Sequence, residues 1–197
     1  AFYFLVESTV PEFDAIYNID EPRIRQLMRI IYDRGHEIGL HGSYGTYKNG
    51  KQLKRQFAKL RRVMDEENIV QEKIGIRQHY LRWSTSETPS NMEEAGLTYD
   101  TTLGFSDHAG FRCGTCYEYP LFDLKNRKQL KIIERPLVAM ECSVLDDVYM
   151  GLDTESATEY LQQLKKSTKQ VNGNFTLLWH NSYFKNNIYR QIYENLI

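Results

Sequence analysis

The chain has 197 residues, 41% of them hydrophobic and 26% charged, with 12 glycines and 5 prolines. This balance excludes a disordered or fibrous protein, and the length predicts a single domain over 1–197 with a long loop insertion at about 104–128. The net charge of −1 argues against a nucleic-acid partner, and no apolar run approaches the roughly 20 residues that span a bilayer.

Short apolar segments alternate with helical patterns in the first half of the chain. Four segments are typical of buried strands: 1–6, 36–40, 74–77 and 99–103. Three stretches with apolar residues at helical spacing lie between them: 22–34, 53–64 and 88–95. Pro22 opens the first of these helices and Gly35 closes it, as the preferences of helix ends predict.

The second half begins with an irregular stretch rich in glycine and polar residues, which we interpret as a long loop over 104–116. Strand pieces are predicted at 130–133, 137–140 and 175–179, with helices from about 154 and over 188–196. The alternation of strands and helices predicts a parallel sheet flanked by helices, either doubly wound or closed into a barrel.

Several polar residues stand where a predicted strand ends: His41, the segment 77–83, Asp100 and His180. In a β/α barrel, these ends form the active-site rim, so residues distant in sequence would converge there. Histidine binds zinc or transfers protons near neutral pH. Taken alone, however, each histidine is more simply explained as a hydrogen-bonded structural residue.

Four segments in order resemble polysaccharide deacetylases of the NodB-homology type, a carbohydrate esterase family 4-like group: GHEIGLHGS at 35–43, RQHY at 77–80, GLTYDTTLGF at 96–105 and LLWH at 177–180. The resemblance covers nearly the whole chain. It implies a distorted (β/α) barrel and a bacterial hydrolase that removes acetyl groups from sugars. Because residues 1–6 resemble the family's second strand, we expect the domain to be N-terminally incomplete.

The resemblance also implies a divalent metal, usually zinc, held by one aspartate and two histidines. His41 matches the first of these histidines, but Gly45 stands at the position of the second, and His79 or His108 is the expected substitute. The family's first motif is an aspartate pair that supplies the base and the third ligand. Nothing in residues 1–20 resembles it, since Asp14 and Asp20 follow the apparent second strand. Either the pair lies upstream of Ala1, or the protein has abandoned the hydrolytic machinery.

By the same resemblance, Arg77 would orient the catalytic carboxylate, and Tyr80 would line the acetyl pocket and offer its backbone amide to the oxyanion. His180 would be the general acid that protonates the leaving amine. Without the family, a surface arginine and a core tyrosine would be the simpler interpretations of Arg77 and Tyr80.

Sugar contacts are expected from aromatic faces and from polar side chains of the long loop. The candidate substrate-binding residues are Trp83, Asp100, Asp107, Arg112 and Trp179. Asp100 has a second interpretation, as a cap at the end of its strand.

The cysteine pair Cys113 and Cys116 allows three interpretations: half of a zinc site, a redox motif, or residues that order the loop. The odd number of cysteines favours a reducing compartment, and hence a cytoplasmic location.

The function predicted from the sequence is therefore metal-dependent deacetylation of an acetylated sugar in a bacterial polysaccharide or its biosynthetic precursor. The alternatives are a catalytically degenerate domain that binds glycan without hydrolysis, and a thiol oxidoreductase built on the cysteine pair.

Overall fold

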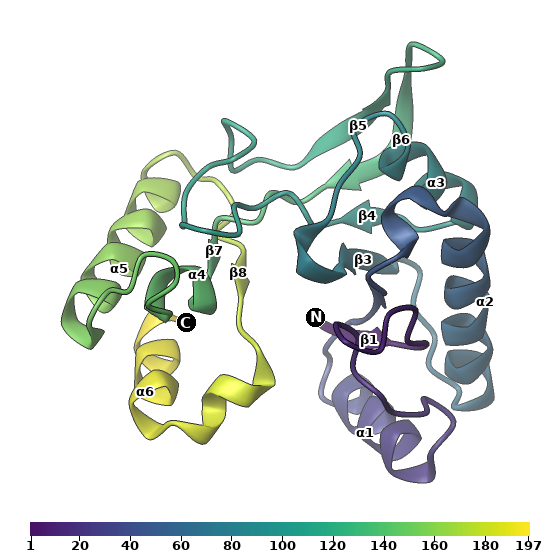
Figure 1. The fold of residues 1–197 in the computed structure, drawn as a ribbon, viewed down its shortest axis with the longest axis horizontal. Coiled ribbons are helices and arrows are strands. Elements are labelled where there is room, and N and C mark those ends of the chain that lie inside the picture. The colour runs from purple at the N-terminus through teal and green to yellow at the C-terminus, as the bar shows by residue number, and fades with distance from the viewer. The chain divides into compact units, whose positions relative to one another are not determined.

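The computed structural model describes residues 1–197, and the chain divides into two compact units (Figure 1). Unit 1 comprises Ala1–Thr102 and Tyr119–Glu134, and unit 2 comprises Leu103–Glu118 and Arg135–Ile197. The chain therefore passes between the units three times, at residues 102, 118 and 134. Each unit is described by itself below, and the single domain over 1–197 stays a prediction.

Unit 1 is built on a six-stranded sheet in the order β1-β2-β3-β4-β6-β5. Its strands are β1 (Phe2–Leu5), β2 (Ile38–Gly42), β3 (Gly75–Gln78), β4 (Tyr99–Asp100), β5 (Tyr119–Asp123) and β6 (Lys128–Glu134). All neighbouring pairs are parallel except β5 and β6, which form an antiparallel hairpin. Because the central strands are parallel, their carboxyl ends lie at one edge of the sheet.

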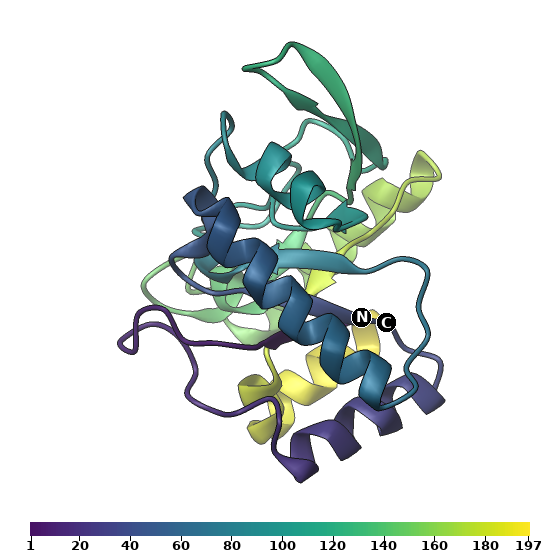
Figure 2. The same ribbon diagram turned by 90° about the vertical axis from the view of Figure 1, so that its right-hand side faces the viewer.

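Three helices cover this sheet: α1 (Pro22–Asp33), α2 (Gly50–Glu66) and α3 (Thr88–Ala95). Two short 3₁₀ helices, η1 (Thr46–Lys48) and η2 (His79–Leu81), follow β2 and β3. The Asn49 side chain caps α2 by accepting the backbone N–H of Gln52, and α3 ends at Gly96 with φ +93°. The apolar stripe of α2, including Leu53 and Leu60, is fully buried, and Figure 2 shows this helix lying across the strands.

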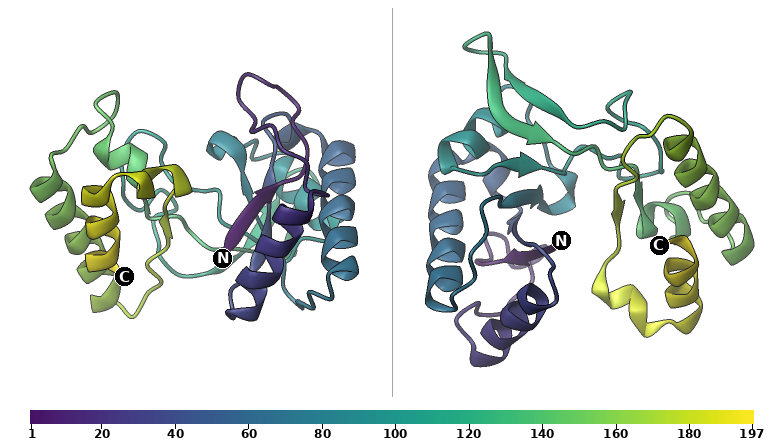
Figure 3. Two further views of the ribbon diagram at one scale, coloured as in Figure 1. Left: turned by 90° about the horizontal axis from the view of Figure 1, so that it is seen from below. Right: turned by 180° about the vertical axis from the view of Figure 1, so that it is seen from behind.

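Unit 2 contains a two-stranded parallel sheet of β7 (Ala139–Met140) and β8 (Leu177–Leu178). Its helices are α4 (Glu141–Leu145), α5 (Thr154–Gln170) and α6 (Asn187–Leu196), with a 3₁₀ helix η3 (Asn181–Lys185). Figure 3 shows α5 beside α6, and Leu161 and Ile192 from these helices belong to the unit's own buried core. Unit 2 thus buries an apolar cluster separate from that of unit 1.

The alternation of strands and helices predicted from the sequence is confirmed for the first half of the chain. Three local predictions differ from the structure. The hairpin of β5 and β6 occupies much of the segment predicted as an inserted loop, and β5 adds an antiparallel edge. The strands predicted at 99–103 and 175–179 are shorter in the structure, where β4 and β8 extend over only two residues each. The strand predicted at 137–140 is reduced to β7, because α4 starts directly after it. The fold is mixed α/β with a mainly parallel sheet, and closure into a barrel stays a prediction.

None of the helices combines the length and the apolar character needed to cross a bilayer.

Candidate active site

His41 lies near the end of β2, one of the central strands of unit 1. It is paired in register with Leu5 of β1 and with Arg77 of β3. Its Nδ1 lies 2.8 Å from the backbone oxygen of Arg77. A carbonyl can only accept, so Nδ1 carries the proton, and the lone pair of the neutral ring is on Nε2.

His79 is the first residue of η2, directly after β3. Its Nδ1 lies 2.8 Å from Oδ1 of Asp14, and its side chain is 18% exposed. The ring centroids of His79 and His41 are 4.8 Å apart, with the rings inclined at 62°. Because Nδ1 of His79 donates to a carboxylate, its lone pair is also on Nε2 when the ring is neutral. The two histidines are therefore adjacent and share one tautomer, the one used for metal binding through Nε2.

Gly45, at the position where the resemblance would place a second histidine, is covered by another segment. Its backbone N–H donates to Oγ1 of Thr9 over 2.9 Å, and a Cβ built at Gly45 would lie 3.2 Å from the same oxygen. A side chain here would press on the loop that follows β1. A side chain at the position of the missing histidine would therefore need Thr9 to shift, while His79 already lies beside His41.

Asp14 holds this loop and His79 together, although no role was predicted for it from the sequence. It accepts backbone N–H groups of Thr9 (2.7 Å), Val10 (3.1 Å) and Tyr44 (2.8 Å), as well as the Thr9 hydroxyl and the His79 imidazole. Burial alone would raise the pKa of Asp14, but the bonds from His79 and the three amides outweigh it and lower the pKa to about 2. Asp14 is therefore a fixed anion and a weak base.

We expect Asp14→Asn to destabilise unit 1 and to remove an acid-sensitive part of its stability. The pKa of Asp14 lies below its unfolded value, so the stabilisation is complete above about pH 4 and is lost as the pH falls through about 2. The shift corresponds to about 2 kcal/mol. Urea unfolding from pH 7 to pH 2.5 should give a smaller pH dependence in the variant, whereas identical pH dependences would contradict the assignment.

Arg77 in β3 is buried and is held by the backbone that follows β4. Its Nε donates to the Thr101 carbonyl over 3.0 Å and an Nη donates to the Thr101 hydroxyl over 3.1 Å. The guanidinium also lies over the Tyr3 ring, 4.9 Å from its centroid. These contacts fix the arginine beside the strand that carries His41, and its role in orienting a catalytic carboxylate stays a prediction.

Asp100 in β4 forms a buried pair with Glu134 in β6, its partner in register. Its two oxygens also accept the backbone N–H of Thr102 over 3.0 Å and the Thr102 hydroxyl over 2.6 Å. Desolvation raises the pKa of Asp100, and its hydrogen bonds with Glu134 and Thr102 oppose this shift without cancelling it. With no exposed surface, Asp100 supports the backbone that holds Arg77 and offers no face to a sugar, contrary to the expectation of a substrate contact.

Tyr80 follows His79 with a strained backbone and an exposed ring. Its φ of 57° and that of Leu81, 49°, are left-handed, which costs about 1–3 kcal/mol per residue. The Tyr80 ring stands edge-on to Phe13 and to Tyr44, each 5.5 Å away, and Phe13 stacks on Tyr44 at 4.3 Å. Since the Tyr80 ring is 4.8 Å from that of His79, an exposed aromatic surface adjoins the histidine pair.

Arg82 packs against the ring of Tyr44, one of the residues of this aromatic surface. Its guanidinium lies 3.9 Å from the ring centroid of Tyr44 and 4.0 Å from that of Tyr47. It also donates to the Tyr44 carbonyl over 2.8 Å and to the Tyr47 hydroxyl over 3.0 Å. Stacked arginine contacts of this kind hold aromatic rings in place. Trp83, the predicted sugar platform nearby, is instead partly buried against the core of unit 1.

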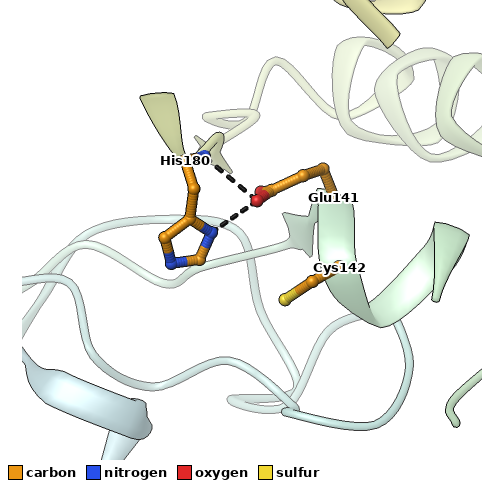
Figure 4. A group of neighbouring side chains, drawn as sticks. All are labelled: Glu141, Cys142 and His180. Atoms are coloured by element: carbon orange, nitrogen blue, oxygen red, sulfur yellow. Dashed lines mark hydrogen bonds and ion pairs between the residues drawn. The ribbon is translucent and has the colours of Figure 1, made fainter. Parts of the chain in front are cut away.

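His180 lies in unit 2, directly after β8, and is paired with Glu141 at the start of α4 (Figure 4). Oε1 of Glu141 accepts the backbone N–H of His180 over 3.0 Å and also its Nδ1–H. Glu141 is fully buried, whereas the His180 side chain is 43% exposed. The pairing of β7 with β8 brings the two residues together. A histidine oriented by a buried carboxylate is a common arrangement in acid–base catalysis.

The remaining candidates from the long loop lie in unit 2. Asp107 and His108 form an exposed pair with Oδ1 and Nδ1 2.8 Å apart, and Arg112 donates to the Gly104 carbonyl over 2.8 Å. Trp179 packs partly buried against the core of the unit. These side chains belong to unit 2, and their sugar contacts stay predictions.

The three cysteines are free thiols. Cys113 donates to the Leu103 carbonyl over 3.6 Å, and Cys116 is buried, so both contribute to the order of their loop. Burial, with Glu141 and Asp146 nearby, raises the pKa of the Cys142 thiol to about 12. Without a cation, this thiol stays protonated at neutral pH and is a poor nucleophile.

Neither a scan against models of protein families nor a search of curated proteins finds a match to this chain. Among solved structures, the chain is similar to the crystal structure of a "putative polysaccharide deacetylase from Mycobacterium smegmatis". The similarity has a TM-score of 0.56 at 22% sequence identity and covers 80% of this chain. It covers 54% of the other chain, so this chain spans about half the length of that protein. At this identity, the similarity shows a shared fold.

Proposed function

We propose that this protein is a hydrolase that removes acetyl groups from an acetylated sugar, in a bacterial polysaccharide or its precursor. The observation that carries the proposal is the adjacent pair of His41 and His79, with both Nδ1 atoms bonded to protein oxygens. The order of motifs in the sequence and the fold shared with a structure described as a deacetylase support it.

The chemistry of this pair fits a divalent metal such as zinc. Two imidazole nitrogens are typical zinc ligands, and a carboxylate and a carbonyl on their other nitrogens are typical outer partners. His41 and His79 would hold the ion, with Asp14 and the Arg77 carbonyl fixing the rings. When bound, such an ion polarises an acetyl carbonyl and acidifies a water molecule.

Apart from the two histidines, the proposed mechanism uses one residue to donate a proton and three aromatic residues to bind the substrate. In the hydrolysis, water adds to the acetyl carbon, the bond from that carbon to the sugar nitrogen or oxygen breaks, and acetic acid leaves and ionises to acetate. The departing atom takes a proton from a general acid, which regains one from the water. By the resemblance, His180, oriented by Glu141, would be this general acid. The aromatic surface of Phe13, Tyr44 and Tyr80 binds the sugar rings.

A second candidate function is glycan binding without hydrolysis. It is favoured by the departures from the family motifs: Gly45 stands in place of the second histidine and no aspartate pair occurs in residues 1–20. Asp14, the acid bonded to His79, does not replace that pair, because its pKa of about 2 makes it too weak a base to take a proton from water. The aromatic surface would bind a glycan even in the absence of a base.

Release of acetate decides between these two functions. The protein, loaded with zinc, should release acetate from N-acetylated or O-acetylated oligosaccharides, and His41→Ala should not. Binding of the same oligosaccharides by both proteins, with no acetate from either, would refute hydrolysis and support the glycan-binding function.

We expect Phe13→Ala to raise KM for an oligosaccharide about fivefold while changing kcat little. The stacked ring contributes about 1 kcal/mol of binding without touching the reacting atoms. Phe122→Ala is the matched control, because Phe122 is similarly exposed on β5 of the same unit, at 47% against 43% for Phe13. Equal KM values for wild type and Phe13→Ala would exclude this ring from the binding surface.

A further inference from the structure

Three potential metal ligands of different chemistry meet at the start of α4. Glu141 and Cys142 are its first two residues, and His180 follows β8, the strand paired with β7. One ligand atom from each, a carboxylate oxygen, the Cys142 sulfur and an imidazole nitrogen, lie within 4.8 Å of one another. Figure 4 shows the sulfur and the carboxylate on the same side of α4, both toward the imidazole.

The carboxylate of Glu141 provides an independent sign of a missing partner. Its Oε1 accepts both the backbone N–H and the ring N–H of His180, whereas the buried Oε2 has no hydrogen-bond partner. A buried carboxylate oxygen without a partner is unfavourable, because it loses its hydration without replacement. A cation bound beside His180 would supply the missing interaction.

The mixture of donors restricts the cation. Sulfur and imidazole nitrogen favour zinc and similar borderline-soft ions over magnesium or calcium, which prefer oxygen. Three protein ligands leave a fourth position for water. This cluster differs from the pair of His41 and His79, which offers two imidazole nitrogens and no sulfur.

We propose that Glu141, Cys142 and His180 form a second metal site, which binds zinc or a similar cation and withdraws His180 from proton transfer. The argument for metal binding uses only the geometry of the three residues. The loss of proton transfer by His180, in contrast, rests on the proposed function. Zinc would therefore support activity at low concentration and inhibit it at higher concentration.

Cobalt titration of the whole protein tests the binding, because a thiolate bound to Co²⁺ gives a near-ultraviolet charge-transfer absorption that imidazole and carboxylate do not. The band is expected in wild type and in His41→Ala, and should be lost in Cys142→Ser and weakened at least tenfold in apparent affinity in Glu141→Gln. Cys113→Ser, which changes another partly buried thiol of unit 2, should keep the band. Thermal unfolding of each variant verifies that it is folded.

No band in wild type, or a band lost in Cys113→Ser and kept in Cys142→Ser, would overturn the site. The second step is tested by acetate release at rising zinc. The zinc concentration that halves the activity should be at least tenfold higher in Cys142→Ser than in wild type, and equal values would overturn the inhibitory role. A cobalt band without any acetate release would leave the metal site standing and refute the proposed hydrolysis.

Discussion

His79→Ala should abolish metal binding by unit 1 and lower acetate release by about a thousandfold or more. The substitution removes one of two adjacent imidazoles, and a metal-dependent hydrolase without its ion loses most of its rate enhancement. Metal content by elemental mass spectrometry and kcat/KM for an acetylated oligosaccharide measure the two effects. Because a second site is proposed at Cys142, the metal measurement is best made in a Cys142→Ser background.

His108→Ala is the matched control for this experiment, since the sequence offered His108 as the other substitute for the missing histidine. Its ring stacks on Phe105 at 4.0 Å and its Nδ1 bonds exposed Asp107 in unit 2. We expect its metal content and kcat/KM to match those of wild type. Loss of metal in His108→Ala together with full metal in His79→Ala would refute the assignment of His79.

The sequence placed His41 and the segment 77–83 at the ends of two predicted strands, but it left His79 and His108 as alternatives beside His41. In parallel neighbouring strands, residues at equivalent ends come together, and His41 and His79 do so at β2 and β3. The alternation of strands and helices therefore indicated that these ends are close, and the contact between the two rings required the structure.

Asp14 and Glu141 could not be found in this way, because each depends on contacts between distant segments. Asp14 reaches His79 across 65 residues only because the loop after β1 folds back over Tyr44 and Gly45. Glu141 reaches His180 across 39 residues through the pairing of two very short strands. Hydrophobic periodicity reports which face of an element is buried, and it does not report which loop covers that face.

The first strand of the hairpin, β5, was missed for a related reason, whereas the strand predicted at 130–133 lies within β6. β5 contains Pro120 and exposes Phe122, so the segment has neither a clean alternation nor an apolar run. The hairpin packs on α3 and on β4, and these tertiary contacts override the weak local pattern.

Glu141→Gln should lower kcat by about 10²- to 10⁴-fold with little change in KM. Glutamine keeps the size of the side chain and can still accept the His180 N–H groups, but it cannot neutralise a protonated imidazole. Steady-state kinetics with an acetylated oligosaccharide, together with thermal unfolding of the same variant, measure the effect. A purely structural role for Glu141 would lower the unfolding temperature and leave kcat of the folded variant near the wild-type value.

Two further variants separate positioning by Glu141 from a general loss of negative charge in unit 2. Glu141→Asp keeps the charge on a shorter chain and should restore part of the activity. Asp146→Asn removes a nearby acid that accepts the Tyr183 hydroxyl over 2.5 Å and has no bond to His180, so kcat should stay near the wild-type value. If Asp146→Asn and Glu141→Gln lower kcat equally, the negative charge of the whole acidic segment accounts for the effect, and the bond between Glu141 and His180 does not.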